Sequence, residues 1–220
     1  MTASKTPSRS VSEAETVAKV CVVDDDAAVR DSLEWLIESV NLPVKTFSNG
    51  MEFLDSNAPF EPGCVILDIR MPGLSGIDVF EDLQERAATI PVIFLTGHGD
   101  VHLAVRAMKA GAFDFIEKPF NDQLLLDLVQ KAIQRDEETA ALHGELGEIK
   151  IRVENLTKRE RQVLDGVVAG GSNRSIAEEL NLSEKTIEFH RSKMMEKMAA
   201  DSLAQLIQMV TTLDKSGGLN

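Results

Sequence analysis

The 220-residue sequence lacks the long apolar segments that carry a chain into or across a membrane. No apolar run approaches the roughly 20 residues that a helix needs to span a bilayer. Residues 1–17 also lack the apolar stretch of a signal peptide, so we expect a disordered N-terminal extension there. Mean hydropathy is -0.08, and we expect a cytoplasmic protein without membrane contact.

Cysteine is scarce as well. The two cysteines, Cys21 and Cys64, lie in or beside apolar runs. This pattern favours buried, reduced thiols in a cytoplasmic protein, and a disulfide between them is the alternative.

The first two thirds of the sequence also lack the common catalytic motifs. They contain no G-x-S-x-G nucleophile elbow, no glycine-rich phosphate loop and no cluster of His and Cys with metal-ligand spacing. A hydrolase or nucleotide-cleaving enzyme therefore finds little support here.

Charge is distributed unevenly along the chain. The net charge is -13, and residues 1–147 hold 12 Lys and Arg against 25 Asp and Glu, whereas residues 148–220 hold 11 of each. Such a step predicts two modules with different tasks. We place the first module at 18–136 and the second at 153–215. The charged, Ala-rich segment 137–152 between them is interpreted as a helical linker.

The first module alternates between two patterns. Short apolar runs of strand type are separated by segments of helical period, such as the one that contains Val29, Leu33, Leu36 and Val40. The apolar runs occupy residues 19–23, 44–47, 65–67, 92–95 and 113–116. Continuous apolar strands that alternate with helices predict a parallel sheet covered on both faces.

Polar residues follow the strand ends. Asp24 and Asp25 follow the first strand, Asp68 follows the third, Thr96 the fourth and Lys118 the fifth. Each alone could be surface charge or a helix cap, the role we expect for Asp26. Because parallel strands end at one edge of the sheet, all should meet there. Carboxylates beside an ammonium and a hydroxyl suit Mg²⁺ and the formation of an acyl phosphate.

The motifs "VVDDD", "ILDIRMPGLSG", "FLTGHGD" and "AGAFDFIEKPF" resemble, in that order, those of the receiver domain of bacterial response regulators. The resemblance implies a flavodoxin-like, five-stranded parallel sheet of order 2-1-3-4-5. It implies that Asp68 is the phosphoacceptor and that Mg²⁺ is held by Asp24, Asp25, Asp68 and the backbone carbonyl of Arg70. Thr96 and Lys118 would contact the phosphoryl group, with a cis peptide after Lys118. Phe115 stands where many receivers carry the switch Tyr.

A receiver of this kind takes its phosphoryl group from a sensor histidine kinase. We expect phosphorylation to create a homodimer, because the segment "VHLAVRAMKAG" carries more apolar surface than one inner helix face requires. The expected contacts are Val105, Arg106, Lys109 and Phe113.

The sequence pattern of the second module predicts four helices. Thr157 with Glu160 forms a capping box for the first, and Ser183 caps the third. Ile187, Met194 and Met198 share one stripe of the third helix. Two short helices, then a tight link at Asn181-Leu182 and a longer basic helix, predict a helix-turn-helix.

The outward face of the third helix is the expected DNA-reading surface. Phe189 on this face suits a thymine methyl or a neighbouring helix, and both readings stay open. Nearby basic and amide groups can hold phosphates. The expected DNA-binding residues are Asn173, Arg174, Lys185, Thr186, Glu188, Phe189, Arg191, Ser192 and Lys193.

The segments "LTKRERQVL" and "GGSNRSIAEELNLSEKTIEFHRSKMMEKM" resemble the LuxR-type DNA-binding domain. Together with the receiver they resemble the FixJ-type transcription regulators. In that family the last helix commonly pairs two DNA-binding domains, so Leu203 and Ile207 are expected to contribute to a dimer interface. Periodicity alone does not separate this role from a place in the core.

Within the linker, Leu142, Leu146, Ile149, Val153 and Leu156 follow a heptad spacing over about two heptads. We expect a helical connector, broken near Gly144, rather than a stable coiled coil.

We therefore interpret the chain as a phosphorylation-activated transcription regulator that binds promoter DNA. It would not be an enzyme beyond its own phosphotransfer and autodephosphorylation. One alternative is a receiver that acts through protein–protein contacts without DNA. Another is a hydrolase using the acidic cluster, which would need turnover on an external phosphate ester.

Overall fold

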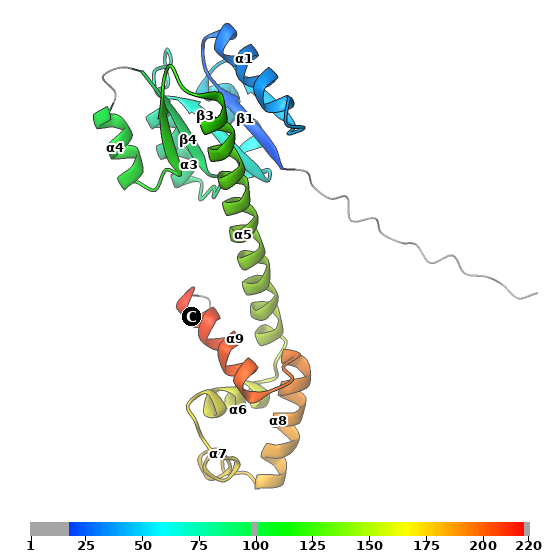
Figure 1. The fold of residues 1–220 in the computed structure, drawn as a ribbon. Helices are drawn as coiled ribbons and strands as arrows, with labels where there is room; N and C mark the ends of the chain where they lie inside the picture. Colours follow the sequence, from blue (N-terminus) through cyan, green and yellow to red (C-terminus); the bar gives the residue numbers. More distant parts are fainter. Residues whose placement is uncertain (1–17, 98–100, 218–220) are drawn as a thin grey trace, which may run out of the picture. The chain divides into compact units, whose positions relative to one another are not determined.

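The chain folds into two compact units in a computed structural model (Figure 1), which describes residues 18–97 and 101–217. One unit ends at Thr139 and the other begins at Ala140. The extension expected at residues 1–17 lies outside the described residues. None of the described helices is long and apolar enough to cross a membrane.

A parallel sheet forms the centre of the first unit. Its strands are β1 (Lys19–Val23), β2 (Val44–Phe47), β3 (Gly63–Asp68), β4 (Val92–Thr96) and β5 (Asp114–Glu117). They pair in the order β2-β1-β3-β4-β5, and every pairing is parallel. The predicted flavodoxin-like sheet and its strand order are confirmed.

Helices cover both faces of this sheet. One face is covered by α1 (Ala27–Glu38) and by α5, which begins at Asp122 and whose first half belongs to this unit. The other is covered by α2 (Gly50–Leu54), α3 (Gly76–Glu85) and α4 (Val101–Lys109) (Figure 1). A short 3-10 turn, η1, spans Ala58–Phe60. Because both faces are covered, all six residues of β3 are buried, which explains its continuous apolar run.

The two cysteines lie on opposite faces of the sheet. Cys21 packs in the core beneath α2–α4, whereas Cys64 packs beneath α1 and α5. Both thiols are free, and burial raises their pKa, that of Cys21 to about 11. The disulfide alternative is therefore wrong, and these are buried, protonated thiols.

The second unit is helical. Its helices are α6 (Lys158–Val168), α7 (Asn173–Leu180), α8 (Glu184–Met198) and α9 (Leu203–Lys215), preceded by the last part of α5. The predicted capping box of Thr157 and Glu160 and the Ser183 cap are both formed. Asn181 ends α7 in a left-handed conformation with φ 53°, which an asparagine adopts more readily than most residues and which turns the chain into α8.

A partly buried ion pair ties α6 to α8. Glu160 accepts a hydrogen bond of 2.7 Å from the Lys197 ammonium, and its side chain is only 7% exposed. The same carboxylate accepts from the backbone N–H of Thr157. The Lys197 ammonium and this backbone bond lower the pKa of Glu160 to about 2, so the capping residue stays ionised.

Helix α5 spans Asp122–Glu154 without interruption and passes through Gly144 and Gly147. The break expected near Gly144 is thus absent. A glycine inside a helix costs about 1 kcal/mol relative to alanine, which does not suffice to end a helix that is packed on either side.

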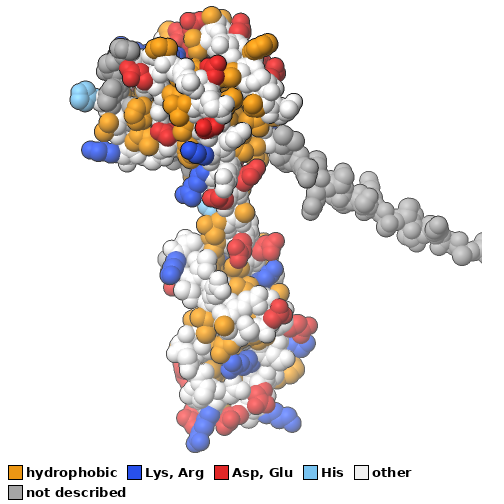
Figure 2. Space-filling model, viewed as in Figure 1, with side chains coloured by type: hydrophobic (Ala, Val, Ile, Leu, Met, Phe, Trp, Pro, Cys, Tyr) orange, Lys and Arg blue, Asp and Glu red, His pale blue; other side chains and the backbone are white. Residues whose placement is uncertain are grey.

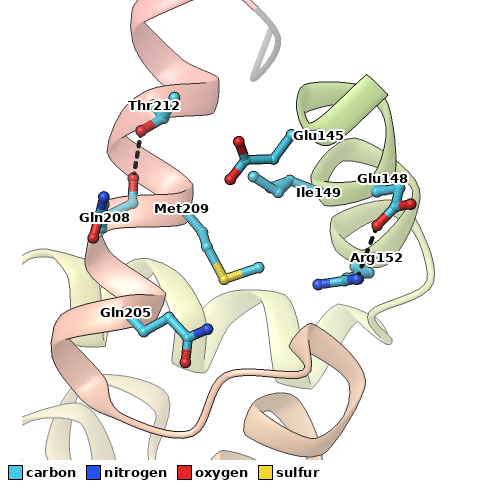
Figure 3. A pocket seen from close by; sticks show the side chains of 8 residues that line it. All are labelled: Glu145, Glu148, Ile149, Arg152, Gln205, Gln208, Met209 and Thr212. Carbon is cyan, nitrogen blue, oxygen red and sulfur yellow. Dashed lines mark hydrogen bonds and ion pairs between the residues drawn. The ribbon is translucent and has the colours of Figure 1, made fainter. Parts of the chain in front are cut away.

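The last turns of α5 belong to the core of the helical unit. Ile149 and Val153 are 2% and 7% exposed, and Leu146 packs against the same core. Figure 3 shows Ile149 and Met209 of α9 directed toward one another in a groove of about 420 Å³. Four of the five heptad residues, Leu146, Ile149, Val153 and Leu156, therefore pack within the unit, whereas Leu142 is 49% exposed.

This packing predicts a difference between two isoleucines on α5. Ile149→Ala should destabilise the helical unit by about 2–5 kcal/mol, because it removes a buried side chain and leaves a cavity. Ile151→Ala is the matched control, since Ile151 is 59% exposed on the same helix. Urea unfolding of both variants, followed by the circular dichroism of the full-length chain, measures the difference. Equal losses would contradict the assignment of Ile149 to the core.

Candidate functional sites

The carboxyl-end edge of the sheet gathers charged side chains. Asp24 follows β1, Asp68 ends β3, and Lys118 follows β5. The Lys118 ammonium lies 2.8 Å from an oxygen of Asp24 and 2.7 Å from an oxygen of Asp68. The structure thus brings together three of the residues that the strand-end pattern singled out.

Asp24 is held both at its carboxylate and at its backbone carbonyl. The backbone N–H of Asp26 donates to Asp24 Oδ1 at 2.9 Å, and the Arg30 guanidinium donates to the Asp24 carbonyl at 2.7 Å. Asp26 itself caps α1 as predicted, by accepting from the N–H of Ala28. Sequence reasoning missed Arg30, because an arginine in the first turns of a helix gives no sign of which carbonyl it reaches.

Asp68 is held by the turn that follows it. Its Oδ2 accepts from the backbone N–H of Arg70 at 2.8 Å. The chain then returns so closely that a Cβ at Gly76 would lie 2.2 Å from the Asp68 carbonyl oxygen. Only glycine fits there, so Gly76 at the start of α3 sets how near the helix approaches the acid. This role, too, was missed from the sequence.

Burial and hydrogen bonds to charged neighbours have opposite effects on the pKa values of Asp68 and Lys118. Asp68 is 7% exposed, and burial raises its pKa while the hydrogen bond to Lys118 lowers it. Burial would lower the pKa of Lys118, but its hydrogen bonds to Asp24 and Asp68 raise it instead. The result is an ammonium that neutralises one of two buried negative charges.

The remaining receiver residues lie around this centre. Thr96, at the end of β4, is buried, and its hydroxyl donates a long bond of 3.4 Å to the Ile116 carbonyl. The peptide between Lys118 and Pro119 is cis, as expected. Phe115 is half-buried and packs toward the core beneath α2–α4. Thr96 and Phe115 are therefore near the strand ends but are not bonded to Asp68.

The oxygen donors suit a hard cation. Asp25 is exposed and lines a pocket of about 540 Å³ together with Arg70. Within the described ranges, no group of three or more Asp, Glu, His or Cys side chains already surrounds one point, since Asp24 and Asp68 face Lys118. Mg²⁺ needs only one or two carboxylates and takes water and phosphate as further ligands, so the donor set fits this ion.

In the helical unit, α8 presents the surface expected to read DNA. Ile187, Met194 and Met198 are buried, as predicted. Phe189 is 61% exposed, and its one ring contact among the described residues is with the adjacent His190, at 5.6 Å between ring centroids. Phe189 is therefore not part of the buried core of its unit.

The polar residues of this surface differ in their partners. Arg191 donates to Asn173 at 2.9 Å, Arg174 pairs with Glu178, and Lys193 pairs with Glu196. Glu188 and Ser192 are exposed, while Thr186 is half-buried near the α8 cap. Lys185 is exposed and makes no ion pair within the described part of the chain. Figure 2 shows basic and acidic side chains interspersed on the visible face of this unit.

The residues expected at dimer contacts fall into two groups. On α4, Val105 is 44% exposed and Lys109 is exposed, while Arg106 pairs with Glu81 of α3 at 3.0 Å. Phe113 packs beneath α1 and α5, so it is not brought onto the α4 face.

Helix α9 carries both buried and exposed apolar residues. Leu206 and Val210 are buried in the core of the unit. Leu203 is 41% exposed and Ile207, one turn later, is half-buried. The exposed strip is thus distinct from the core face.

Comparisons with known proteins match both units. Residues 20–130 match the model of the response regulator receiver domain, and residues 154–210 match that of the bacterial regulatory proteins of the luxR family. The transcriptional regulatory protein FixJ of Bradyrhizobium diazoefficiens is 43% identical over 93% of this chain and 98% of its own length. Nodulation protein W of the same organism is 45% identical over 91% of this chain and 88% of its own.

Solved structures agree with these matches. The response regulator StyR superposes with a TM-score of 0.80 at 41% identity, covering 88% of this chain and 98% of StyR. Full-length FixJ from B. japonicum gives a TM-score of 0.56 at 43% identity, covering 93% of this chain and all of that one.

The charge arrangement at the sheet edge predicts the effect of removing the ammonium that contacts both carboxylates. Lys118→Met should raise the pKa of Asp68 further, because burial and the nearby Asp24 then act without the ammonium. Carboxyl-carbon shifts of the full-length chain, followed against pH by NMR, measure this. Lys109→Met on exposed α4 is the control and should leave the Asp68 titration unchanged. An unaltered Asp68 titration in Lys118→Met would show that the ammonium does not govern this carboxyl.

Proposed function

The chain belongs to the FixJ-type response regulators, which are phosphorylation-dependent, DNA-binding transcription regulators, and we propose that Asp68 is its phosphoacceptor. The observation that supports this proposal is the difference in solvent exposure between the two buried carboxylates. The Asp68 side chain is 10% exposed against 2% for Asp24, so a phosphodonor can reach Asp68. The donor would be the sensor histidine kinase that a receiver domain implies.

The neighbouring groups would stabilise the transferred phosphoryl group by charge and hydrogen bonds. Mg²⁺ would supply positive charge beside the phosphoryl oxygens. It would be held by Asp24, Asp25, Asp68 and the Arg70 carbonyl. Lys118 would exchange its contact with Asp68 Oδ1 for a phosphoryl oxygen. The long bond of Thr96 to Ile116, at 3.4 Å, is weak enough to be given up for the same purpose.

Movement of Thr96 would vacate space next to β5 and let the Phe115 ring turn inward. Phe115 lacks the hydroxyl of a tyrosine, so this switch would rest on packing alone. The protein would act on its own Asp68 only, through phosphotransfer and autodephosphorylation, and would not turn over an external substrate.

The output would be a two-fold symmetric dimer on promoter DNA in the cytoplasm. Val105, Arg106 and Lys109 on α4 would pair two receivers, and Leu203 with Ile207 on α9 would pair two helical units. Such a dimer matches a palindromic site. Glu188, Phe189 and Ser192 on α8 would face base edges, while Asn173, Arg174, Lys185, Arg191 and Lys193 would hold phosphates and Thr186 would support the start of α8.

The phosphoacceptor is tested by Asp68→Asn. This variant should lose labelling by acetyl phosphate, because an amide cannot form the acyl phosphate, and acetyl phosphate should no longer strengthen its DNA binding. Asp31→Asn, an exposed acid on α1, is the control and should label normally. Alkali-labile labelling of Asp68→Asn at the wild-type level would reassign the site.

The reading surface is tested by a pair of substitutions on α8. Phe189→Ala should keep the wild-type melting temperature, since the ring is exposed, but should reduce discrimination between specific and random duplexes by about 1–3 kcal/mol. Lys185→Ala should weaken binding to both duplexes alike and lower the salt slope by about one unit.

Both variants are measured for stability, salt dependence and the ratio of specific to random affinity. A Phe189→Ala protein that melts earlier and keeps the wild-type ratio would remove Phe189 from the reading surface.

A further inference from the structure

A second pocket lies in the receiver at the end of the sheet opposite Asp68. Its volume is about 320 Å³, and it is formed where β4 begins, by the end of α3, the loop after it, the turn before β5 and one face of α5. We call it the α5 pocket, after the helix that contributes Arg135 and Thr139 to it. The phosphorylation site contributes no residue to its lining.

The pocket combines apolar walls with one positive charge. Phe80, Ile90 and Val92 are buried side chains of its wall, and Phe113 is half-buried. Among the residues that line it, Arg135 is the one that carries a charge. The Arg135 guanidinium is exposed and makes no hydrogen bond or ion pair within the described ranges.

Gln84, Thr89 and Thr139 add neutral polar groups to this lining. Apolar walls with a few polar groups are the usual form of a small-molecule site, and about 300 Å³ is the lower end of the usual size. Arginine binds a carboxylate through two parallel hydrogen bonds, which fix its orientation. We propose that the α5 pocket binds a small apolar monocarboxylate, with its carboxylate on Arg135 and its body against Phe80, Val92 and Phe113. An amine of the same size would meet the like charge of Arg135.

Because of where the α5 pocket lies, a bound ligand would affect the stability of helix α5. Arg135 and Thr139 lie in the last turns of α5 before the first unit ends at Thr139. Asp136, between them, already anchors this stretch by accepting from the backbone N–H of Gly63 at 2.9 Å. A ligand on Arg135 would add a second anchor, to the loop between α3 and β4. It would therefore stabilise this part of α5 without involving Asp68.

Calorimetric titration of the unphosphorylated full-length chain tests the proposal. The probes are benzoate, phenylacetate and hexanoate, with benzyl alcohol and benzylamine for comparison. At least one carboxylate should bind, benzylamine should not, and Arg135→Gln should weaken the carboxylate at least about tenfold, as expected for loss of charged hydrogen bonds. Weak binding of benzyl alcohol should be unaffected by the substitution.

Lys131→Gln is the matched control, because Lys131 is an exposed cation one turn earlier on α5 and does not line the pocket. It should bind the carboxylate as the wild type does. Hydrogen exchange should slow at residues 135–139 when the carboxylate is bound, in the wild type and not in Arg135→Gln. The proposal is overturned if none of the three carboxylates binds at about 10 mM, or if Arg135→Gln binds as tightly as the wild type.

Discussion

The ammonium of Lys118 between Asp24 and Asp68 is the interaction on which the site depends. Two carboxylates at this edge are buried, and burial of unpaired charge is costly. The Lys118 ammonium lies 2.8 Å from an oxygen of Asp24 and 2.7 Å from an oxygen of Asp68. Its positive charge therefore offsets one carboxylate charge, and it donates a hydrogen bond to each side chain. Removal of one partner from such a pair is more damaging than replacement of both, because it leaves a buried charge alone. The fold must therefore place the ends of β1, β3 and β5 correctly before any chemistry can occur.

That requirement explains why the local structure around the acids is so closely determined. Asp24 is fixed through Asp26 and Arg30, and the turn after Asp68 is held by the close approach of Gly76. A group that is already oriented loses little freedom when it reacts. By contrast, the Thr96 hydroxyl makes only one long bond among the described residues, and it is the group that the proposed switch requires to move.

Continuous apolar strands followed by charge are readable along the chain, so they predicted the parallel sheet and the residues at its edge. The strand order came from the resemblance to receiver domains. It could not predict which neighbour each residue meets. Periodicity put Leu203 and Leu206 on one apolar helix, but only the fold shows that Leu206 is buried and Leu203 is 41% exposed. Phe113, which was expected at a dimer contact, is half-buried and packs beneath α1 and α5, a position that the apolar pattern of its segment does not specify. The glycines of α5 were read as a break, although packing of Ile149 and Val153 outweighs their cost.

Helix α5 contributes to the cores of both units, and its stability cannot be uniform. Leu125 and Val129 are buried in the receiver, and Ile149 and Val153 are buried in the helical unit. Between these anchors, residues 140–145 are all exposed and include Gly144. An isolated helix of so few residues is not stable in water, so this stretch is held only by the packed turns on either side. Local opening concentrates where buried contacts are fewest. Any change that weakens either anchor should therefore increase local opening first at residues 140–145.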